Sequence, residues 1–181
     1  MISAIDIKKL WYADAITEPN AADLQPSDIA TLIGAEGGAT EIANVHQDTW
    51  TVDESEPSQD FYKNQLTGMV YREGTKTMGE VTFNFTIGQY DYETKAALMG
   101  GEVIGENKGW KRARGTVNLK KMLIALTEDD VYVVLPYANV NTREANTDGA
   151  VGLAVVGTAM EPASQNVSAE YWFDATEVAG E

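Results

Sequence analysis

The sequence predicts a mainly β domain: an antiparallel β-sandwich, or a barrel-like pair of sheets, with one short helix at its flank. Residues 81–87 alternate apolar and polar side chains, which is typical of a half-buried strand. Two apolar runs at 122–126 and 131–135 are separated by a short polar stretch, which is typical of a hairpin. Residues 91–99 combine a helix cap, a helical apolar face and a glycine stop. A length of 181 residues suits one core, so residues 1–181 are assigned to one domain.

The first forty residues are predicted to be one strand followed by an ordered acidic loop. Residues 2–12 are extended, but their apolar positions change phase, so they do not indicate which face is buried. Within residues 17–40, Ser27 can cap a short helical turn that reaches Leu32, and Gly34 then ends it early. We therefore expect a loop rather than a helix in this region.

A strand and then a long loop are expected between residues 41 and 78. Residues 41–52 are rich in β-branched side chains, and a bulge near 46–48 accounts for their imperfect alternation. Residues 53–78 show turn residues and mixed charge without a regular period. A connection this long is unusual inside a compact domain and tends to carry function or an interaction.

The segment GEVTFNFTIGQYDYETKAALMGG, residues 79–101, is predicted to be a strand that leads into a helix. The apolar side chains of 81–87 share one face of the strand. Asp91 can cap a helix that runs to about Met99, and Gly100 supplies the left-handed position that stops it. The shape of this segment therefore has a local explanation.

The C-terminal half is predicted to consist of hairpins. The sequence GENKG, at 105–109, predicts a turn before a basic strand, WKRARGTVNL. Pro136 restricts the strand at 131–135 to a sheet edge or a break, because proline lacks the N–H that a central strand needs. The sequence NTDG predicts another tight turn. A strand at 150–160, a last strand at 169–173 and a short acidic tail complete the chain.

The charge of the chain argues against a protein that grips nucleic acid. The formal net charge is −15, whereas binding to phosphates needs a surface of Lys and Arg. Residues 1–60 carry two basic and twelve acidic side chains, residues 61–130 ten and nine, and residues 131–181 one and seven. Such separate regions suit contacts between identical subunits, in which one patch meets a different one. An ordinary solubilising surface is the other explanation.

Cysteine content and hydropathy limit the cellular compartment that is expected for the protein and the kinds of site that it can form. The chain has no cysteine, so disulfides, thiolate metal sites and cysteine nucleophiles are excluded. No apolar run reaches the length of a membrane span, and the sequence MISAIDIKKLWYADAI lacks the apolar centre of a signal peptide. We therefore expect a cytoplasmic product with no membrane partner.

No residue pattern predicts a catalytic, cofactor or metal site. His46 is the only histidine, and nothing near it resembles the turn that carries a serine nucleophile. The glycines lack the spacing of a nucleotide-binding loop. We expect a protein that is not an enzyme and needs no cofactor. A group of acidic loop residues lacks the spacing of an EF-hand, so a solvated loop explains it: Asp53, Glu54, Glu56 and Asp60.

One basic cluster interrupts this acidic chain. Its cations can form a surface for an acidic sister subunit, and a solvated strand edge explains them as well. The members are Lys108, Lys111, Arg112 and Arg114.

Three stretches together resemble the tail tube (major tail) proteins of long-tailed bacteriophages and prophages. They are GEVTFNFTIGQYDYETKAALMGG, the apolar VYVVLPYANV with its Pro-aromatic break, and the closing strand GLAVVGTAMEP. The resemblance covers roughly residues 40–162. The loop at 17–40 has no counterpart in it.

The resemblance implies a structural subunit of a virion tail that is made in the cytoplasm of the bacterial host. Subunits of that family form stacked hexameric rings around a lumen, through which DNA passes without specific binding. Their partners are identical subunits and other tail proteins. The family fold is a sandwich or barrel-like pair of sheets with a flanking helix, here at 91–99. Contractile tails and secretion-system tubes use the same architecture, so the fold alone does not choose among them.

By this resemblance, residues 53–78 are the segment that reaches a neighbouring subunit or ring. The apolar side chains in this segment are unfavourable in water unless a partner covers them. The predicted inter-subunit residues are Tyr62, Lys63, Leu66, Met69, Tyr71 and Arg72.

A carbohydrate- or protein-binding β-sandwich module is the alternative. It would be a monomer with an aromatic platform that includes Trp50, Trp110 or Trp172. A small enzyme with paired carboxylates is a third option, which a loss of activity on carboxylate substitution would support. Self-assembly separates the first two hypotheses.

Overall fold

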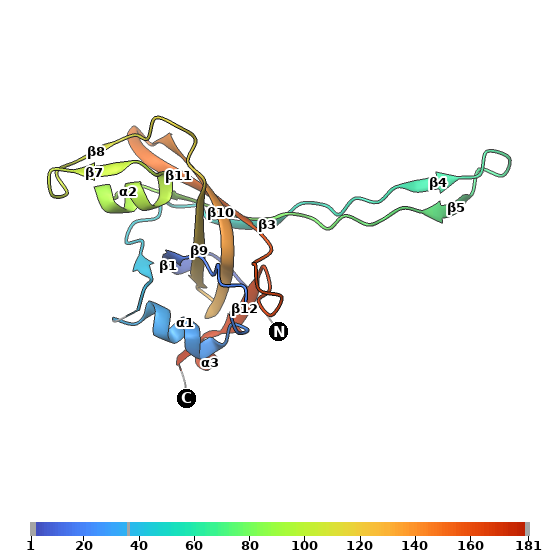
Figure 1. Ribbon diagram of the computed structural model, residues 1–181, viewed down its shortest axis with the longest axis horizontal. Helices are drawn as coiled ribbons and strands as arrows, with labels where there is room; N and C mark the ends of the chain where they lie inside the picture. The colour runs from blue at the N-terminus through green and yellow to red at the C-terminus, as the bar shows by residue number, and fades with distance from the viewer. Residues whose placement is uncertain (1–2, 36, 180–181) are drawn as a thin grey trace.

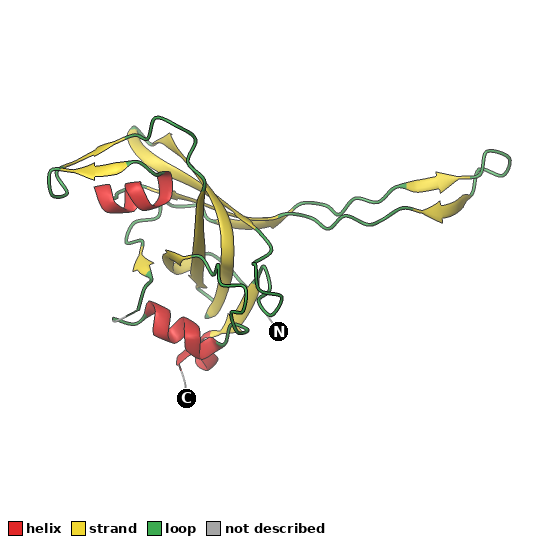
Figure 2. Cartoon of the chain, viewed as in Figure 1, coloured by secondary structure: helices red, strands yellow, loops and turns green. Residues whose placement is uncertain are grey.

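Antiparallel strands are the predominant secondary structure of the protein, seen in a computed structural model that describes residues 3–35 and 37–179 (Figures 1 and 2). Within these residues, eight strands form one sheet in the order β2-β1-β9-β10-β11-β6-β3, with β12 beside β10. The predicted mainly β, antiparallel, sandwich-like fold is confirmed. The strands are β1 (Ile7–Asp14), β2 (Thr40–Glu41), β3 (Thr51–Glu54), β4 (Phe61–Lys63), β5 (Val70–Glu73), β6 (Val81–Ile87), β7 (Glu102–Ile104), β8 (Gly109–Lys111), β9 (Leu119–Thr127), β10 (Val131–Thr147), β11 (Ala150–Ala159) and β12 (Tyr171–Asp174), and the helices are α1 (Pro26–Ile33), α2 (Tyr92–Met99) and α3 (Ala175–Ala179).

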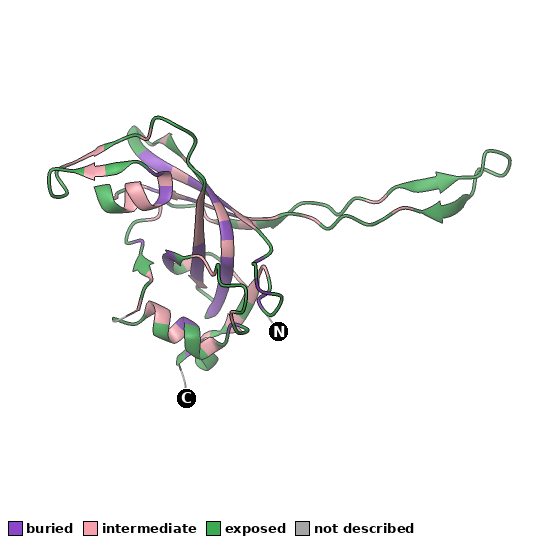
Figure 3. Ribbon diagram, viewed as in Figure 1, coloured by how far each residue is buried: buried purple, intermediate pink, exposed green. Residues whose placement is uncertain are grey.

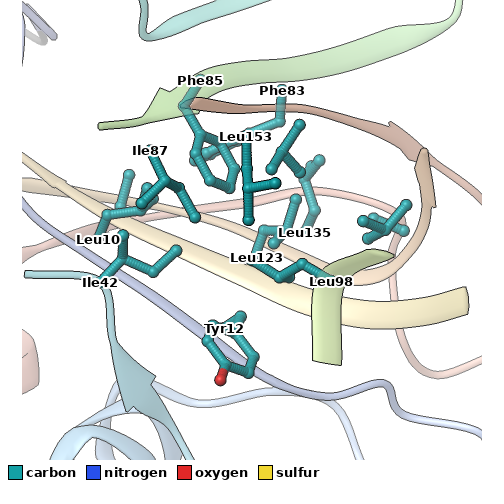
Figure 4. Close-up of a cluster of buried hydrophobic side chains, with 14 of the residues drawn as sticks. Leu10, Tyr12, Ile42, Phe83, Phe85, Ile87, Leu98, Leu123, Leu135 and Leu153 are labelled. Atoms are coloured by element: carbon teal, nitrogen blue, oxygen red, sulfur yellow. The ribbon is translucent and has the colours of Figure 1, made fainter. Parts of the chain in front are cut away.

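The large sheet curls so that its two ends share one core. β1 and β6 lie near opposite ends of the strand order, yet Leu10 and Phe85 belong to the same buried cluster (Figure 4). The segment between β2 and β3 closes the gap between them. The Ile42 N–H donates to the Leu10 carbonyl at 2.8 Å, and the His46 N–H donates to the Thr86 carbonyl at 2.7 Å. This closure makes the fold sandwich-like rather than an open sheet.

A second core lies on the outer face of the sheet, beneath α1 and α3. Ile29 from α1 and Val178 from α3 are buried with Met122 and Ile124 of β9. The prediction of a single helix is therefore wrong, because α1 interrupts the loop expected at 17–40 and α3 lies in the expected acidic tail. Helices of eight and five residues are too short to be stable alone, so packing against the sheet and against each other decides their formation.

The central hairpin β9–β10 is buried on both faces. Leu123 points into the first core and its neighbour Met122 into the second. This explains why the apolar runs at 122–126 and 131–135 are continuous instead of alternating. The predicted hairpin is confirmed, and Asp130 takes a left-handed φ of 61° in its turn.

Proline in β10 marks a change of partner rather than the end of the strand. β10 continues through Pro136 for 17 residues in all. Residues 131–134 pair with β12, residues from Ala138 pair with β11, and the register against β9 shifts between Leu135 and Ala138. The expected break is thus a bulge inside a longer strand, which tolerates the missing N–H.

Two predicted strands near the N-terminus have different bounds. β1 begins at Ile7 after Asp6, which has a left-handed φ of 45°, and residue 2 lies outside the described residues. The strand expected at 41–52 is instead two short strands, β2 and β3. Asp48 between them has a φ of 58°, so a turn replaces the expected bulge.

The predicted tight turns are present. Asp148 and Gly149 have φ values of 50° and 89°, which suit the two-residue turn that joins β10 to β11. The sequence GENKG joins β7 to β8, and Glu106 and Asn107 take left-handed φ values of 53° and 66°. The strand predicted over WKRARGTVNL is interrupted: its first two residues belong to β8, its last residue begins β9, and the residues between them are not in a strand. The last two predicted strands are β11 and β12.

The predicted helix α2 is confirmed together with its two end signals. Asp91 Oδ1 accepts a hydrogen bond from the Thr94 N–H at 2.7 Å. Gly100 ends the helix with a φ of 78°, a conformation that favours glycine. Leu98 is fully buried in the first core, so α2 packs on the inner side of the curled sheet.

Replacing Asp91 by alanine is expected to lower the free energy of unfolding by about 1 kcal/mol, because the helix loses its cap. The backbone N–H of Thr94 holds the pKa of Asp91 below its usual value. The contribution of the charged cap is therefore present above the usual aspartate pKa and is lost as pH falls through the lowered one. Urea unfolding between about pH 7 and about pH 2.5 should show the difference between the two proteins shrinking on acidification. A difference that stays constant would contradict this role.

Candidate functional site: a projecting arm

Residues 55–79 form a two-stranded arm that projects from the body of the molecule (Figure 1). Near its base, Ser58 and Thr77 exchange backbone hydrogen bonds of 3.0 and 2.8 Å, and β4 pairs with β5 further out. At strand geometry each side of the arm is about 30 Å long. The long connection predicted at 53–78 is present, but it is not irregular throughout, because β4 pairs with β5 and Ser58 pairs with Thr77.

A turn at the tip makes this pairing possible. Asn64 Oδ1 accepts from the Leu66 N–H at 2.8 Å, and the Gly68 N–H donates to the Asn64 carbonyl at 2.8 Å. Gly68 has a left-handed φ of 70°. The flanking FYK and VYR stretches are rich in aromatic and β-branched residues. The sequence thus carries a hairpin signal that the loop prediction missed.

The base of the arm leaves no room for a side chain at residue 79. A Cβ atom on Gly79 would overlap the Ser55 carbonyl oxygen. The Glu80 N–H donates to Ser55 Oγ at 2.8 Å, and the Ser55 N–H donates to the Glu80 carbonyl at 3.0 Å. These contacts hold the two sides of the arm together where they leave β3 and β6.

The tip of the arm, residues 61–72, carries large apolar side chains on both faces that no other part of the chain covers (Figure 3). Leu66 at the turn is 97% exposed and Tyr71 is 68% exposed. Phe61 and Tyr62 are consecutive in β4, so they point to opposite faces, and both are exposed. Covering one large apolar side chain is worth about 1.5–3 kcal/mol. A partner that contacts both faces would stabilise this ribbon, since an isolated hairpin is marginal in water.

Two cations give the tip its charge. Residues 61–72 contain Lys63 and Arg72 and no acidic residue, although the whole chain has a net charge of −15. Among the described residues, neither cation forms an ion pair. The Arg72 guanidinium carbon lies 5.3 Å from the centre of the Tyr62 ring. The tip therefore suits a partner surface that is apolar and acidic.

The structure brings the six predicted inter-subunit residues together in the tip. β4 holds Tyr62 and Lys63, the turn holds Leu66 and Met69, and β5 holds Tyr71 and Arg72. Sequence reasoning missed three further exposed apolar side chains of the arm. Two of them belong to the hairpin signal described above, and the third lies near the base: Phe61, Val70 and Met78.

The single histidine of the sequence lies beside an aspartate. His46 Nε2 lies 3.1 Å from Asp148 Oδ2, at the turn between β10 and β11. In the described part of the chain, no three His, Asp or Glu side chains are close enough to hold a metal ion. None of the helices described there is long and apolar enough to cross a membrane.

The basic cluster at 108–114 is partly neutralised within the chain. Lys111 pairs with Glu102 at 2.8 Å, and Arg112 pairs with Glu144 at 3.1 Å. A hydrogen bond from Lys95, 2.7 Å away, holds the pKa of Glu144 below its usual value. The Lys111–Glu102 pair joins the two strands of the β7–β8 hairpin, and Glu144 of β10 joins the residue after β8 to α2. Half of the cluster therefore has a structural role.

The tryptophans expected of an aromatic platform lie on separate elements. Trp50 packs edge-on against Phe83 in the first core, with ring centres 5.8 Å apart. Trp110 is in β8, where its Nε1–H donates to the Gly100 carbonyl at 2.9 Å. Trp172 is in β12. The three side chains do not form one flat surface.

Comparison with known proteins does not assign a function to the arm. The sequence matches no model of a known protein family, and no curated protein matches it.

Proposed function

We propose that the chain is a self-assembling structural subunit of a phage or prophage tail tube. In this proposal, hexameric rings of the subunit stack around a lumen that conducts DNA, and identical subunits and other tail proteins are the partners. The arm is the observation that carries the proposal. The arm is an extended, hydrogen-bonded ribbon with exposed apolar side chains at its tip. These side chains are unfavourable in water, and a neighbouring subunit that contacts the tip would cover them.

The fold and the charge support the same proposal. One of the three stretches that carry the resemblance, residues 79–101, forms β6 and α2 directly after the arm. A net charge of −15 suits the wall of a DNA conduit, because carboxylates do not bind phosphates. No catalytic chemistry is assigned to the chain in this function.

Light scattering across a concentration series, with negative-stain electron microscopy of the same samples, tests the proposal. We expect rings or tubes of uniform width. A monomer at every concentration would weigh against a tube subunit and favour the carbohydrate- or protein-binding module. A glycan-binding screen would then test that alternative.

A further inference from the structure

Six carboxylates belong to the end of the body that lies away from the β7–β8 hairpin in Figure 1. This end consists of the β9–β10 turn, β12 and α3, and we name it the acidic end. The Ala175 N–H donates to the Asp130 carbonyl at 2.9 Å, and Val131 pairs with Asp174, so these elements are contiguous. Of the carboxylates at this end, only Asp130 has a cation partner among the described residues, Lys8 at 2.6 Å. The carboxylates are Glu128, Asp129, Asp130, Glu170, Asp174 and Glu177.

Exposed apolar side chains lie among these carboxylates. Trp172 is 42% exposed, and its Nε1–H donates to Glu170 Oε1 at 2.6 Å. Because side chains alternate along β12, Asp174 lies on the same face as Trp172, and Glu170 lies just before the strand. Ile5 is 61% exposed, and its carbonyl accepts from the Glu128 N–H at 3.1 Å. The acidic end thus presents an indole flanked by carboxylates.

We propose that the arm tip docks on the acidic end of a second copy of this chain, with Trp172 at the centre of the contact. This inference rests on the proposed self-assembly and names the surface that receives the arm. The tip carries apolar side chains with Lys63 and Arg72. The acidic end carries apolar side chains and six carboxylates, five of which have no cation partner within the described residues. Charge and hydrophobicity are therefore complementary. The β7–β8 hairpin carries two cations and two carboxylates, so it offers the cations of the tip no net charge.

The second copy is required by the geometry of the arm. Its backbone hydrogen bonds keep it extended, and Figure 1 shows its tip far from the β12 of its own chain. The tip and the acidic end are different surfaces. Two chains that are joined by one contact therefore still have one free tip and one free acidic end. Such head-to-tail contacts continue into a closed ring or an open stack.

Charge reversal tests this contact. Arg72→Glu and Asp174→Arg are each expected to weaken self-association roughly tenfold or more, because each places like charges together. A chain with both changes should recover association, since the pair is restored with opposite signs. Lys108→Glu is the matched control: it makes the same charge change on the β7–β8 hairpin and should leave association unchanged. Sedimentation equilibrium measures all four variants.

Cross-linking locates the contact directly, because the chain has no cysteine of its own. Under mild oxidation, a Thr67→Cys chain mixed with a Ser168→Cys chain should give a disulfide-linked dimer. Thr67 lies at the tip and Ser168 lies just before β12, and both are exposed. The same Thr67→Cys chain mixed with a Thr116→Cys chain, which carries its cysteine beyond the β7–β8 hairpin, should give none.

Each contrary result overturns the inference. Unchanged association in both single reversals, no recovery in the double variant, or a cross-link to the Thr116→Cys chain would show that the tip binds elsewhere. A chain that stays monomeric and forms no cross-link would exclude a second copy as the partner. Deleting the arm separates the two proposals. Tubes formed by the deleted chain would overturn this inference and leave the proposed function standing, whereas an intact chain that forms no rings or tubes would count against the proposed function.

Discussion

A chain that lacks residues 63–77 is expected to fold as the intact chain does and to form no stacked rings. The arm supplies no side chain to either buried cluster, so its removal takes nothing from the cores. It does remove Lys63, Leu66, Met69 and Tyr71, which are the side chains we assign to the neighbouring subunit. Circular dichroism and a thermal melt measure the fold, and light scattering with negative-stain microscopy measures assembly.

A second variant keeps the arm and changes only its surface. Serine in place of Leu66, Met69 and Tyr71 retains the ribbon but removes the exposed apolar area. It should fail to assemble as the deletion does, because the free energy of the contact comes from covering those side chains. Tubes formed by the deleted chain would show that the role assigned to the arm is wrong.

Phe85→Ala is expected to lower the free energy of unfolding by about 3–5 kcal/mol. The Phe85 side chain is 1% exposed and packs edge-on against Phe83 at 6.1 Å between ring centres. It lies in the core shared by the two ends of the curled sheet, so a cavity there loosens the closure between β6 and β1. Urea unfolding followed by tryptophan fluorescence measures the change.

Val156→Ala is the matched control for this cavity. Val156 lies on β11, one residue from the Val155 that pairs with Phe85, and it is 38% exposed on the opposite face of the sheet. The expected loss is below about 1 kcal/mol, since an exposed side chain leaves no cavity. Equal losses in the two variants would mean that the inner face of the sheet has been assigned wrongly.

The region from β6 to α2 is the part of the fold that the sequence predicts best, because its determinants are local. The alternation in 81–87 sets which side chains are buried within the strand itself. The cap on α2 joins Asp91 to Thr94, three residues away, and Gly100 stops the helix through its own backbone conformation. The tight turns before β8 and β11 are local for the same reason.

For the arm, the sequence predicted the contact residues but not their conformation. Residue type alone predicted that Tyr62, Leu66, Met69 and Tyr71 would need a partner, and the structure places them at the tip of one element. The shape of that element was not predicted. Pairing along the arm joins residues such as Ser58 and Thr77, and no period in 53–78 indicates which residues face each other across so long a loop.

What the sequence determined by itself was therefore the mainly β class, the β6–α2 segment, the tight turns and the residues with unsatisfied apolar surface. The tertiary structure alone decided the curl of the sheet, the helices α1 and α3, and the extended arm. Each of these depends on contacts between residues far apart in the chain. The curl needs β1 and β6 to share a core, and the two short helices need the outer face of β9 and β10 beneath them. Contacts of that kind are set by how whole elements pack, and local sequence patterns do not contain them.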